Sequence, residues 1–200
     1  MKLYDMPQRS DEWFAVRLGK ITSTSFATMA NGQPSTIETL CYKVAAERIT
    51  GVASGNGYTN AAMEHGVETE ALARLAYETR SFAAIQEVGF AELDEYIGVS
   101  PDGLVDNDGG VEIKCPQPHT HLQYLAEKTP WRSYKWQIQG CLWVTGRDWW
   151  DFASFCPDFP AGKQLLVERV VPDAAAFKKL AAGADHCRKR IAEIMEAFNA

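Results

Sequence analysis

The chain has 200 residues, of which 46% are hydrophobic and 23% charged, ordinary values for a soluble globular protein with a sizeable core. It contains no run of about 18 or more apolar residues and no N-terminal apolar stretch of signal-peptide length, so we expect no membrane span and a cytoplasmic location. The net charge of −6 argues mildly against a protein that coats nucleic acid, but it does not exclude an enzyme that binds DNA in a local basic cleft.

The spacing of hydrophobic residues predicts helices through the first part of the chain. A capping-box pair, Ser35 and Glu38, predicts where the third helix begins, after a loop over residues 31–35, and Gly51 is the expected stop. The predicted helices span residues 9–18, 22–30, 35–50 and 60–79. The apolar stripe expected on the fourth helix consists of Met63, Val67, Ala71 and Leu75.

The middle of the chain changes to short segments rich in Val, Ile and Phe, bounded by turn residues, which predict strands. The run Asp-Asn-Asp-Gly-Gly at 106–110 predicts a tight hairpin turn. We therefore expect an α/β fold over 1–200, one domain with a central mixed β-sheet flanked by helices. The expected elements are strands at 83–90, 96–100, 111–115, 149–156 and 164–171, a helix near 133–144 and a long amphipathic C-terminal helix.

The five cysteines are scattered along the chain, and none belongs to a Cys-x-x-Cys pair. A zinc site or a disulfide framework is therefore not expected, and we predict reduced, mostly buried thiols. The cysteines are Cys41, Cys115, Cys141, Cys156 and Cys187.

The residues with the clearest chemical meaning are Asp102, Glu112 and Lys114. Glu112 and Lys114 share one face of a strand, and the hairpin brings Asp102 beside them. Adjacent carboxylates repel each other, and a hard divalent cation such as Mg²⁺ relieves that repulsion, with the carbonyl of Ile113 as a further oxygen ligand. Lys114 could then orient or deprotonate a water for attack on phosphorus. This motif alone leaves open a plain turn followed by an exposed ion pair.

Five blocks of residues extend this motif, and they are Arg9-x-x-x-Trp13-x-x-x-Arg17-x-Gly19 with Ile21-Thr22-Ser23, then Gly66-x-x-x-Glu70, Ser100-Pro101-Asp102-Gly103, Glu112-Ile113-Lys114-Cys115-Pro116, and Gln137-x-Gln139 with Trp143-Val144-Thr145-Gly146. In this order they resemble the phage lambda exonuclease family, also called the YqaJ-type viral recombinases, of the PD-(D/E)xK nuclease superfamily. The resemblance runs from about Gln8 to Glu168. It implies a restriction-endonuclease-like core and a Mg²⁺-dependent exonuclease that degrades double-stranded DNA from its 5′ ends.

The resemblance also implies roles for individual residues. Asp102 and Glu112 resemble the metal ligands, Lys114 the catalytic lysine and Glu70 the helix glutamate near the metals, with two Mg²⁺ ions expected and Mn²⁺ able to substitute. The positions expected to hold the 5′-phosphate of the cut strand are Arg17, Ser100, Gln137 and Thr24. Arginine suits this task because its guanidinium binds phosphate with two parallel hydrogen bonds.

Further expectations concern the assembly and its partners. Family members form ring-shaped homotrimers around the DNA, cut processively to leave 3′ single strands for phage-type recombination, and work with a single-strand annealing protein. A phage or prophage origin in a bacterial host is implied in the same way. Two alternatives stay open: a structure-specific or restriction-type endonuclease on the same core, and a DNA-binding scaffold that has lost catalysis.

Some segments are assigned no role in catalysis. The Pro- and His-rich segment 117–121 departs from the lambda member of the family, which carries a basic residue there, and we expect a loop with exposed His119 and His121. The basic run 188–190 is expected on a solvated helix face. The aromatic residues expected in the core rather than against DNA bases are Trp143, Trp149, Trp150, Phe152 and Phe155.

Overall fold

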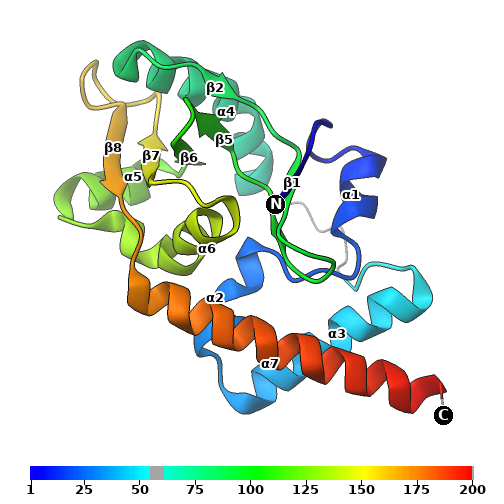
Figure 1. Cartoon of the computed structure of the whole chain (residues 1–200). Coiled ribbons are helices and arrows are strands. Elements are labelled where there is room, and N and C mark those ends of the chain that lie inside the picture. The colour runs from blue at the N-terminus through cyan, green and yellow to red at the C-terminus, as the bar shows by residue number, and fades with distance from the viewer. Residues whose placement is uncertain (55–60, 200) are drawn as a thin grey trace.

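The structure is a computed structural model that describes residues 1–54 and 61–199, excluding the side chains of 61–68 (Figure 1). In chain order its elements are β1 (Lys2–Tyr4), α1 (Asp11–Arg17), the 3₁₀ helix η1 (Ser23–Ser25), α2 (Phe26–Asn31), α3 (Pro34–Thr50), α4 (Ala61–Ser81), β2 (Ile85–Gln86), β3 (Phe90–Glu92), β4 (Gly98–Val99), β5 (Gly103–Val105), β6 (Gly109–Lys114), α5 (Pro118–Ala126), the 3₁₀ helix η2 (Pro130–Tyr134), α6 (Lys135–Thr145), β7 (Trp149–Phe155), β8 (Leu165–Val170) and α7 (Ala174–Asn199).

The larger sheet has the strand order β2-β5-β6-β7-β8. Its only parallel pair in the described part of the chain is β6 with β7, in register from Gly109 opposite Trp149 to Lys114 opposite Ser154. Parallel neighbours need a long crossover, and α5, η2 and α6 supply it. The predicted mixed sheet flanked by helices is therefore confirmed, and β1, β3 and β4 form a second, antiparallel sheet.

Hydrophobic clusters cover both faces of the larger sheet. On one face Ala73 and Tyr77 of α4 pack against Val111 and Ile113 of β6. On the other face the core continues into α2, α3, α6 and α7, where Ile138 and other residues of α6 meet the inner strands. The central strand β6 is consequently buried on both sides, unlike a strand with one solvated face.

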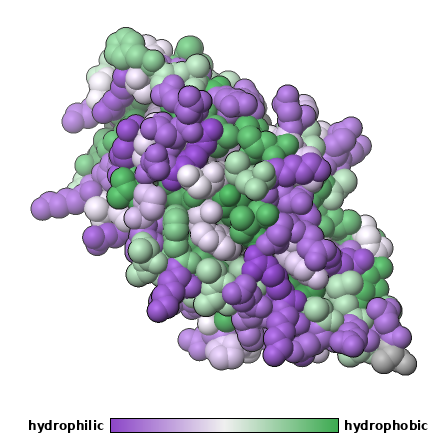
Figure 2. Space-filling model, in the orientation of Figure 1, coloured by the Kyte–Doolittle hydropathy of each residue, from purple (hydrophilic) through white to green (hydrophobic). Residues whose placement is uncertain are grey.

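Helix α7 runs along α2 and α3 at the bottom of the view in Figure 1. Hydrophilic side chains are prominent along it in the space-filling view (Figure 2). The basic run expected on a solvated helix face is only partly solvated, because two of its three residues form ion pairs with other segments of the chain. Arg188 donates to Asp94 at 2.5 Å and Arg190 to Glu38 at 2.5 Å, whereas the side chain of Lys189 is 80% exposed.

The predicted start of α3 is also wrong. The helix begins at Pro34 with Gln33 as its cap, because proline suits the first helical turn, where its missing N–H is not needed. Ser35 lies inside the helix, and the Glu38 carboxylate is bonded to Arg190 of α7 instead of to the helix start. The stop at Gly51 is confirmed, with a left-handed backbone (φ 69°) that glycine adopts without strain.

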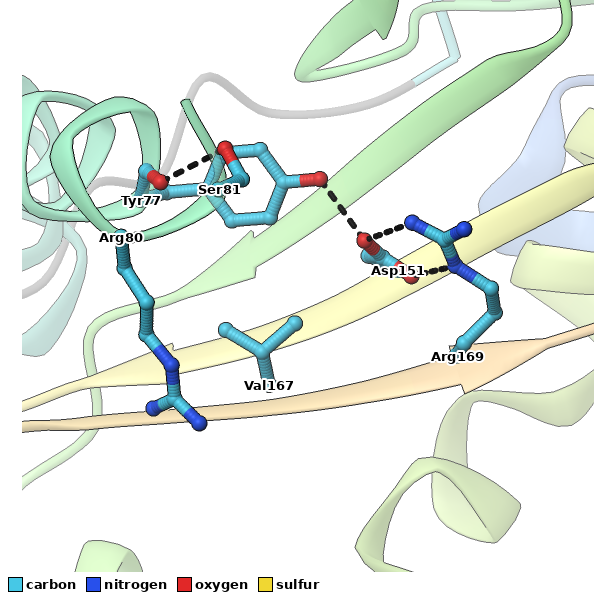
Figure 3. A pocket seen from close by; sticks show the side chains of 6 residues that line it. All are labelled: Tyr77, Arg80, Ser81, Asp151, Val167 and Arg169. Carbon is cyan, nitrogen blue, oxygen red and sulfur yellow. Dashed lines mark hydrogen bonds and ion pairs between the residues drawn. The ribbon is translucent and has the colours of Figure 1, made fainter. Parts of the chain in front are cut away.

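The two described members of the apolar stripe expected on α4 do not face the sheet. Leu75 is 61% exposed and Ala71 is exposed, while Ala73 and Tyr77 are buried; the side chains of Met63 and Val67 lie outside the described ones. The face of α4 that carries Tyr77 is turned toward the sheet, and the Tyr77 hydroxyl donates to the buried Asp151 of β7 at 2.7 Å. Arg169 completes this contact with two hydrogen bonds to the same carboxylate (Figure 3).

The strand predicted at 83–90 is two strands in different sheets, β2 and β3. The break falls at Gly89, whose backbone is approached by the N-terminal segment. A Cβ there would lie 2.4 Å from the carbonyl oxygen of Met6, and Tyr4 accepts a hydrogen bond from the Gly89 N–H. The short strands β1 and β5 were not predicted, because three residues carry too little periodicity.

The segment expected as an exposed His-rich loop is instead helix α5. Pro118 opens this helix, and His119 is exposed as expected. His121 is fully buried, with its two ring nitrogens 2.8 Å from Ser154 Oγ and 2.9 Å from the carbonyl oxygen of Lys163. Its role is therefore structural, since neither nitrogen is left for a metal.

Several expectations about burial are confirmed. All five cysteines are free thiols, and four of them are buried. Trp150, Phe152 and Phe155 lie in the core, with Trp143 and Trp149 packed against it. Among the described residues, no helix combines the length and the apolar composition needed to cross a membrane.

Candidate active site

The three predicted catalytic residues meet at the end of strand β6. Asp102 lies between β4 and β5, and its Oδ2 accepts a hydrogen bond of 2.7 Å from the backbone N–H of Ile113. Glu112 and Lys114 project from the same face of β6, and Lys114 Nζ donates to Glu112 Oε1. The hairpin therefore assembles the set that the sequence predicted, and the alternative of an exposed ion pair is wrong because Glu112 is fully buried.

The site has an excess of buried negative charge. Burial, and then the nearby charge of Glu112, raises the pKa of Asp102 to about 7. Burial by itself would lower the pKa of Lys114, but the charges of Glu112 and Asp102 outweigh it and raise that pKa above its usual value. Lys114 is thus held as a cation, and a single ammonium group faces two carboxylates.

These residues fit a divalent cation. Glu112 Oε2 is buried and has no hydrogen-bond partner among the described residues, although burial without a partner is costly for a carboxylate oxygen. A hard cation with oxygen ligands would satisfy this atom and offset the repulsion from Asp102. Asp102 and Glu112 are accordingly the residues that would hold it, and the carbonyl of Ile113 stays a predicted ligand.

Glu70 lies near enough to Asp102 to feel its charge, but its carboxylate is bonded to Arg74. Burial, followed by the charge of Asp102, raises its pKa, against the opposing effect of Arg74. Arg74 Nη2 holds the Glu70 carboxylate at 2.6 Å. Within the described part of the chain, no three His, Cys, Asp or Glu side chains form a ready metal-binding group. The predicted role of Glu70 near the metals remains a prediction.

A second group of side chains surrounds Arg17. Its Nη1 donates to Ser100 Oγ at 2.7 Å, and its guanidinium stacks 4.1 Å from the ring centroid of Trp13. Trp13 Nε1 donates to the same hydroxyl at 2.9 Å. Burial lowers the pKa of Arg17 to about 10, and no described carboxylate pairs with it. A half-buried arginine with a hydroxyl partner and no acid is suited to an anion.

Two predicted members of the phosphate site lie elsewhere in the structure. Gln137, near the start of α6, donates to Glu112 Oε1 at 2.5 Å, and no described contact joins it to Arg17. Thr24 is exposed on η1, and the hydroxyl that Arg17 Nη2 reaches, at 3.4 Å, belongs to Thr22. Trp13 and Thr22 belong to the motif blocks of the sequence, but only their contacts in the structure reveal a role for them.

Tyr134 was also missed. Lys114 Nζ lies 5.1 Å from its ring centroid, and its hydroxyl is 2.8 Å from that of Tyr124. The ring stacks on Phe152 at 5.4 Å. The end of η2 therefore forms an aromatic wall beside the lysine, and no feature of the sequence around residue 134 indicated it.

A match to a known protein family covers the residues of this site. The model of the YqaJ-like viral recombinase domain matches residues 12–148, a span that contains the carboxylates, Lys114 and Arg17. The chain belongs to this family. The whole chain resembles the crystal structure of LHK-Exo in complex with dAMP, with 30% identity, a TM-score of 0.83 and coverage of 94% of this chain and 96% of the other.

Two further solved structures resemble this YqaJ-like chain. The alkaline exonuclease LHK-Exo from Laribacter hongkongensis gives a TM-score of 0.79 at 30% identity, covering 95% of this chain and 98% of the other. A phage-related exonuclease from Haemophilus somnus 129PT gives 0.72 at 15% identity, covering 90% and 96%, which shows a shared fold. A comparison with curated proteins gives no match. Membership of the family supports a nuclease function.

Proposed function

We propose that this YqaJ-like protein is a divalent-metal-dependent exonuclease that degrades double-stranded DNA from its 5′ ends. The observation that carries the proposal is the link between the two groups of side chains. Ser100, which accepts from Arg17, stands two residues before Asp102 in the same chain segment. A terminal phosphate bound at Arg17 would therefore be held a fixed distance from the carboxylates.

Each residue has a distinct task in this reaction. Arg17 and Ser100 bind the 5′-phosphate, and Trp13 fixes both through its ring and its N–H. Asp102 and Glu112 would hold a divalent cation, which would supply Lewis-acid activation of the phosphodiester. Lys114, charged and hydrogen-bonded to Glu112, donates a hydrogen bond that orients the attacking water. Gln137 holds the Glu112 carboxylate in place from α6.

The expected product is a 5′-mononucleotide, which agrees with the binding of dAMP by the related LHK-Exo. Processive cutting, a homotrimeric ring, a single-strand annealing partner and a phage or prophage origin are part of the same proposal. They follow from the resemblance to the lambda exonuclease family. Light scattering of the purified protein would measure the oligomer directly.

The test uses one linear duplex with either a 5′-phosphate or a 5′-hydroxyl, and a closed circular duplex, each with Mg²⁺, Mn²⁺ or EDTA. We expect mononucleotides from the linear DNA only, in the presence of metal, and faster from the 5′-phosphate end. Cutting of the circle would establish the endonuclease alternative. Metal-independent binding without any cleavage would establish the scaffold alternative.

A further inference from the structure

A cavity of about 610 Å³ opens beside the catalytic carboxylates, within the size range of small-ligand sites. The N-terminal turn forms one wall through Gln8 and Arg9. Helix α4 contributes Glu70 and Arg74, and Asp102 lies at the edge shared with the active site. Arg17 does not line this cavity, so it is separate from the proposed 5′-phosphate site.

The two arginines of the cavity differ in how their charge is used. Arg74 Nη2 is 2.6 Å from Glu70, and its Nη1 is 2.5 Å from Glu87, so two acids neutralise it. Arg9 is exposed, and within the described part of the chain no hydrogen bond or ion pair within 4.0 Å holds its guanidinium. Arg9 is therefore the cation of this wall that is left to bind a ligand.

The backbone of Arg9 is unusual for a residue with a long side chain. Its φ is 71°, in the left-handed region that favours glycine. Its neighbours fix this turn: Gln8 Nε2 donates to the carbonyl oxygen of Pro101 at 2.8 Å, and Ser10 Oγ accepts from the N–H of Trp13 at 3.2 Å. The strained turn that carries Arg9 is thus attached, through Gln8, to Pro101, the residue before Asp102.

We propose that Arg9 binds an internal backbone phosphate of the DNA, in addition to the terminal phosphate at Arg17. The inference rests on the proposed function, because DNA is the polyanion that brings a phosphate to the carboxylates. Arg74 is bonded to both Glu70 and Glu87, and Asp102 is a proposed metal ligand, whereas Arg9 acts on Glu70 only through its charge and without a hydrogen bond. Its guanidinium donors are therefore available to a phosphate. The contact positions the duplex and is independent of base sequence.

The experiment compares Arg9→Gly and Arg9→Lys in a Lys114→Ala background, in which no cleavage is expected. The ligands are short duplexes with a 5′-phosphate or a 5′-hydroxyl, and the readouts are the Kd at several salt concentrations and the Tm. Lys189→Ala is the matched control, because it removes an exposed positive charge on α7.

We expect Arg9→Gly to bind both duplexes roughly tenfold more weakly, with the slope of log K against log salt reduced by about one. Its Tm should stay equal or rise, since glycine suits this φ. Arg9→Lys should retain most of the affinity, and Lys189→Ala should behave like the parent.

Unchanged affinity and salt slope in Arg9→Gly would overturn the proposal, and so would a lower Tm with unchanged affinity, which would assign Arg9 a structural role. A loss seen only with the 5′-phosphate duplex would also overturn it, because Arg9 would then share the terminal phosphate. Failure of the wild-type protein to cut linear DNA would instead refute the proposed function, so the two failures are distinguishable.

Discussion

Asp102 accepts a hydrogen bond of 2.7 Å from the backbone N–H of Ile113, eleven residues further along the chain. The bond places the Asp102 carboxylate close enough to Glu112 and Lys114, which flank Ile113 on β6, for their charges to shift its pKa. The position of Asp102 is thus fixed by the backbone of the strand that carries Glu112 and Lys114.

Replacing Asp102 by Asn should abolish metal-dependent cleavage and change how stability depends on pH. Burial and the charge of Glu112 raise the pKa of Asp102 from 3.8 to about 7, so the folded protein binds this proton more tightly than the unfolded chain. The resulting stabilisation is complete below the unfolded pKa and is lost as the pH rises through about 7. In EDTA, the unfolding free energy of the wild type should fall relative to Asp102→Asn between about pH 4 and about pH 7. A constant difference across that range would contradict the prediction.

Replacing Lys114 by Ala should abolish cleavage and leave Glu112 buried without its cation. Breaking a buried ion pair costs about 3–5 kcal/mol, and we expect the lower end because 26% of the Lys114 side chain is exposed. Urea unfolding in EDTA measures this loss. The double variant Glu112→Gln, Lys114→Ala should recover much of it, since the uncompensated charge is then gone. Equal destabilisation of the single and double variants would show that the pair is not the cause.

Trp13→Phe should weaken the preference for a 5′-phosphate end without removing it. The ring stacked on Arg17 is retained, while the Nε1–H donor to Ser100 and to the carbonyl oxygen of Gly89 is lost. One such hydrogen bond contributes about 1 kcal/mol, so we expect the ratio of rates on phosphate and hydroxyl ends to fall roughly fivefold. Arg17→Gln should bring this ratio down to about one, so that both ends are cut at the same rate. A normal ratio in both variants would exclude this site as the phosphate receptor.

Gly140→Ala should destabilise the protein although alanine favours a helix over glycine by about 1 kcal/mol. A Cβ at this position of α6 would lie 2.0 Å from the buried ring of Phe26, and overpacking in a core costs about 1–3 kcal/mol. The Tm should fall, and the shift of α6 should also lower the cleavage rate by moving Gln137. Phe26→Leu in the same chain should relieve the clash and restore part of the Tm. An unchanged Tm in Gly140→Ala would contradict the prediction, because α6 and α2 would then accommodate the extra methyl group without loss of stability.

The sequence predicted most of what depends on local pattern. The alternation along β6, the hairpin turn and the spacing of Asp102, Glu112 and Lys114 are properties of short segments. The structure has all three, although the turn takes only residues 106–108 and the two glycines after it begin β6. Hydrophobic periodicity predicted the wrong buried face on α4, where a tertiary contact sets the orientation of the helix. There Tyr77 reaches the buried Asp151 and turns the helix away from the predicted stripe.

By itself, then, the sequence determined the fold class through its hydrophobic periodicity and the family through its motif blocks. It also predicted that Asp102, Glu112 and Lys114 come together, because their spacing along the hairpin is a local property of the chain. The tertiary structure decided which distant residues meet. It placed Gln137 on Glu112 rather than beside Arg17, buried His121 against Ser154, and set the strained Arg9 at the edge of the cavity that reaches Asp102. These contacts join segments far apart in the chain, and their geometry is set by how helices and sheets pack, which no local pattern encodes.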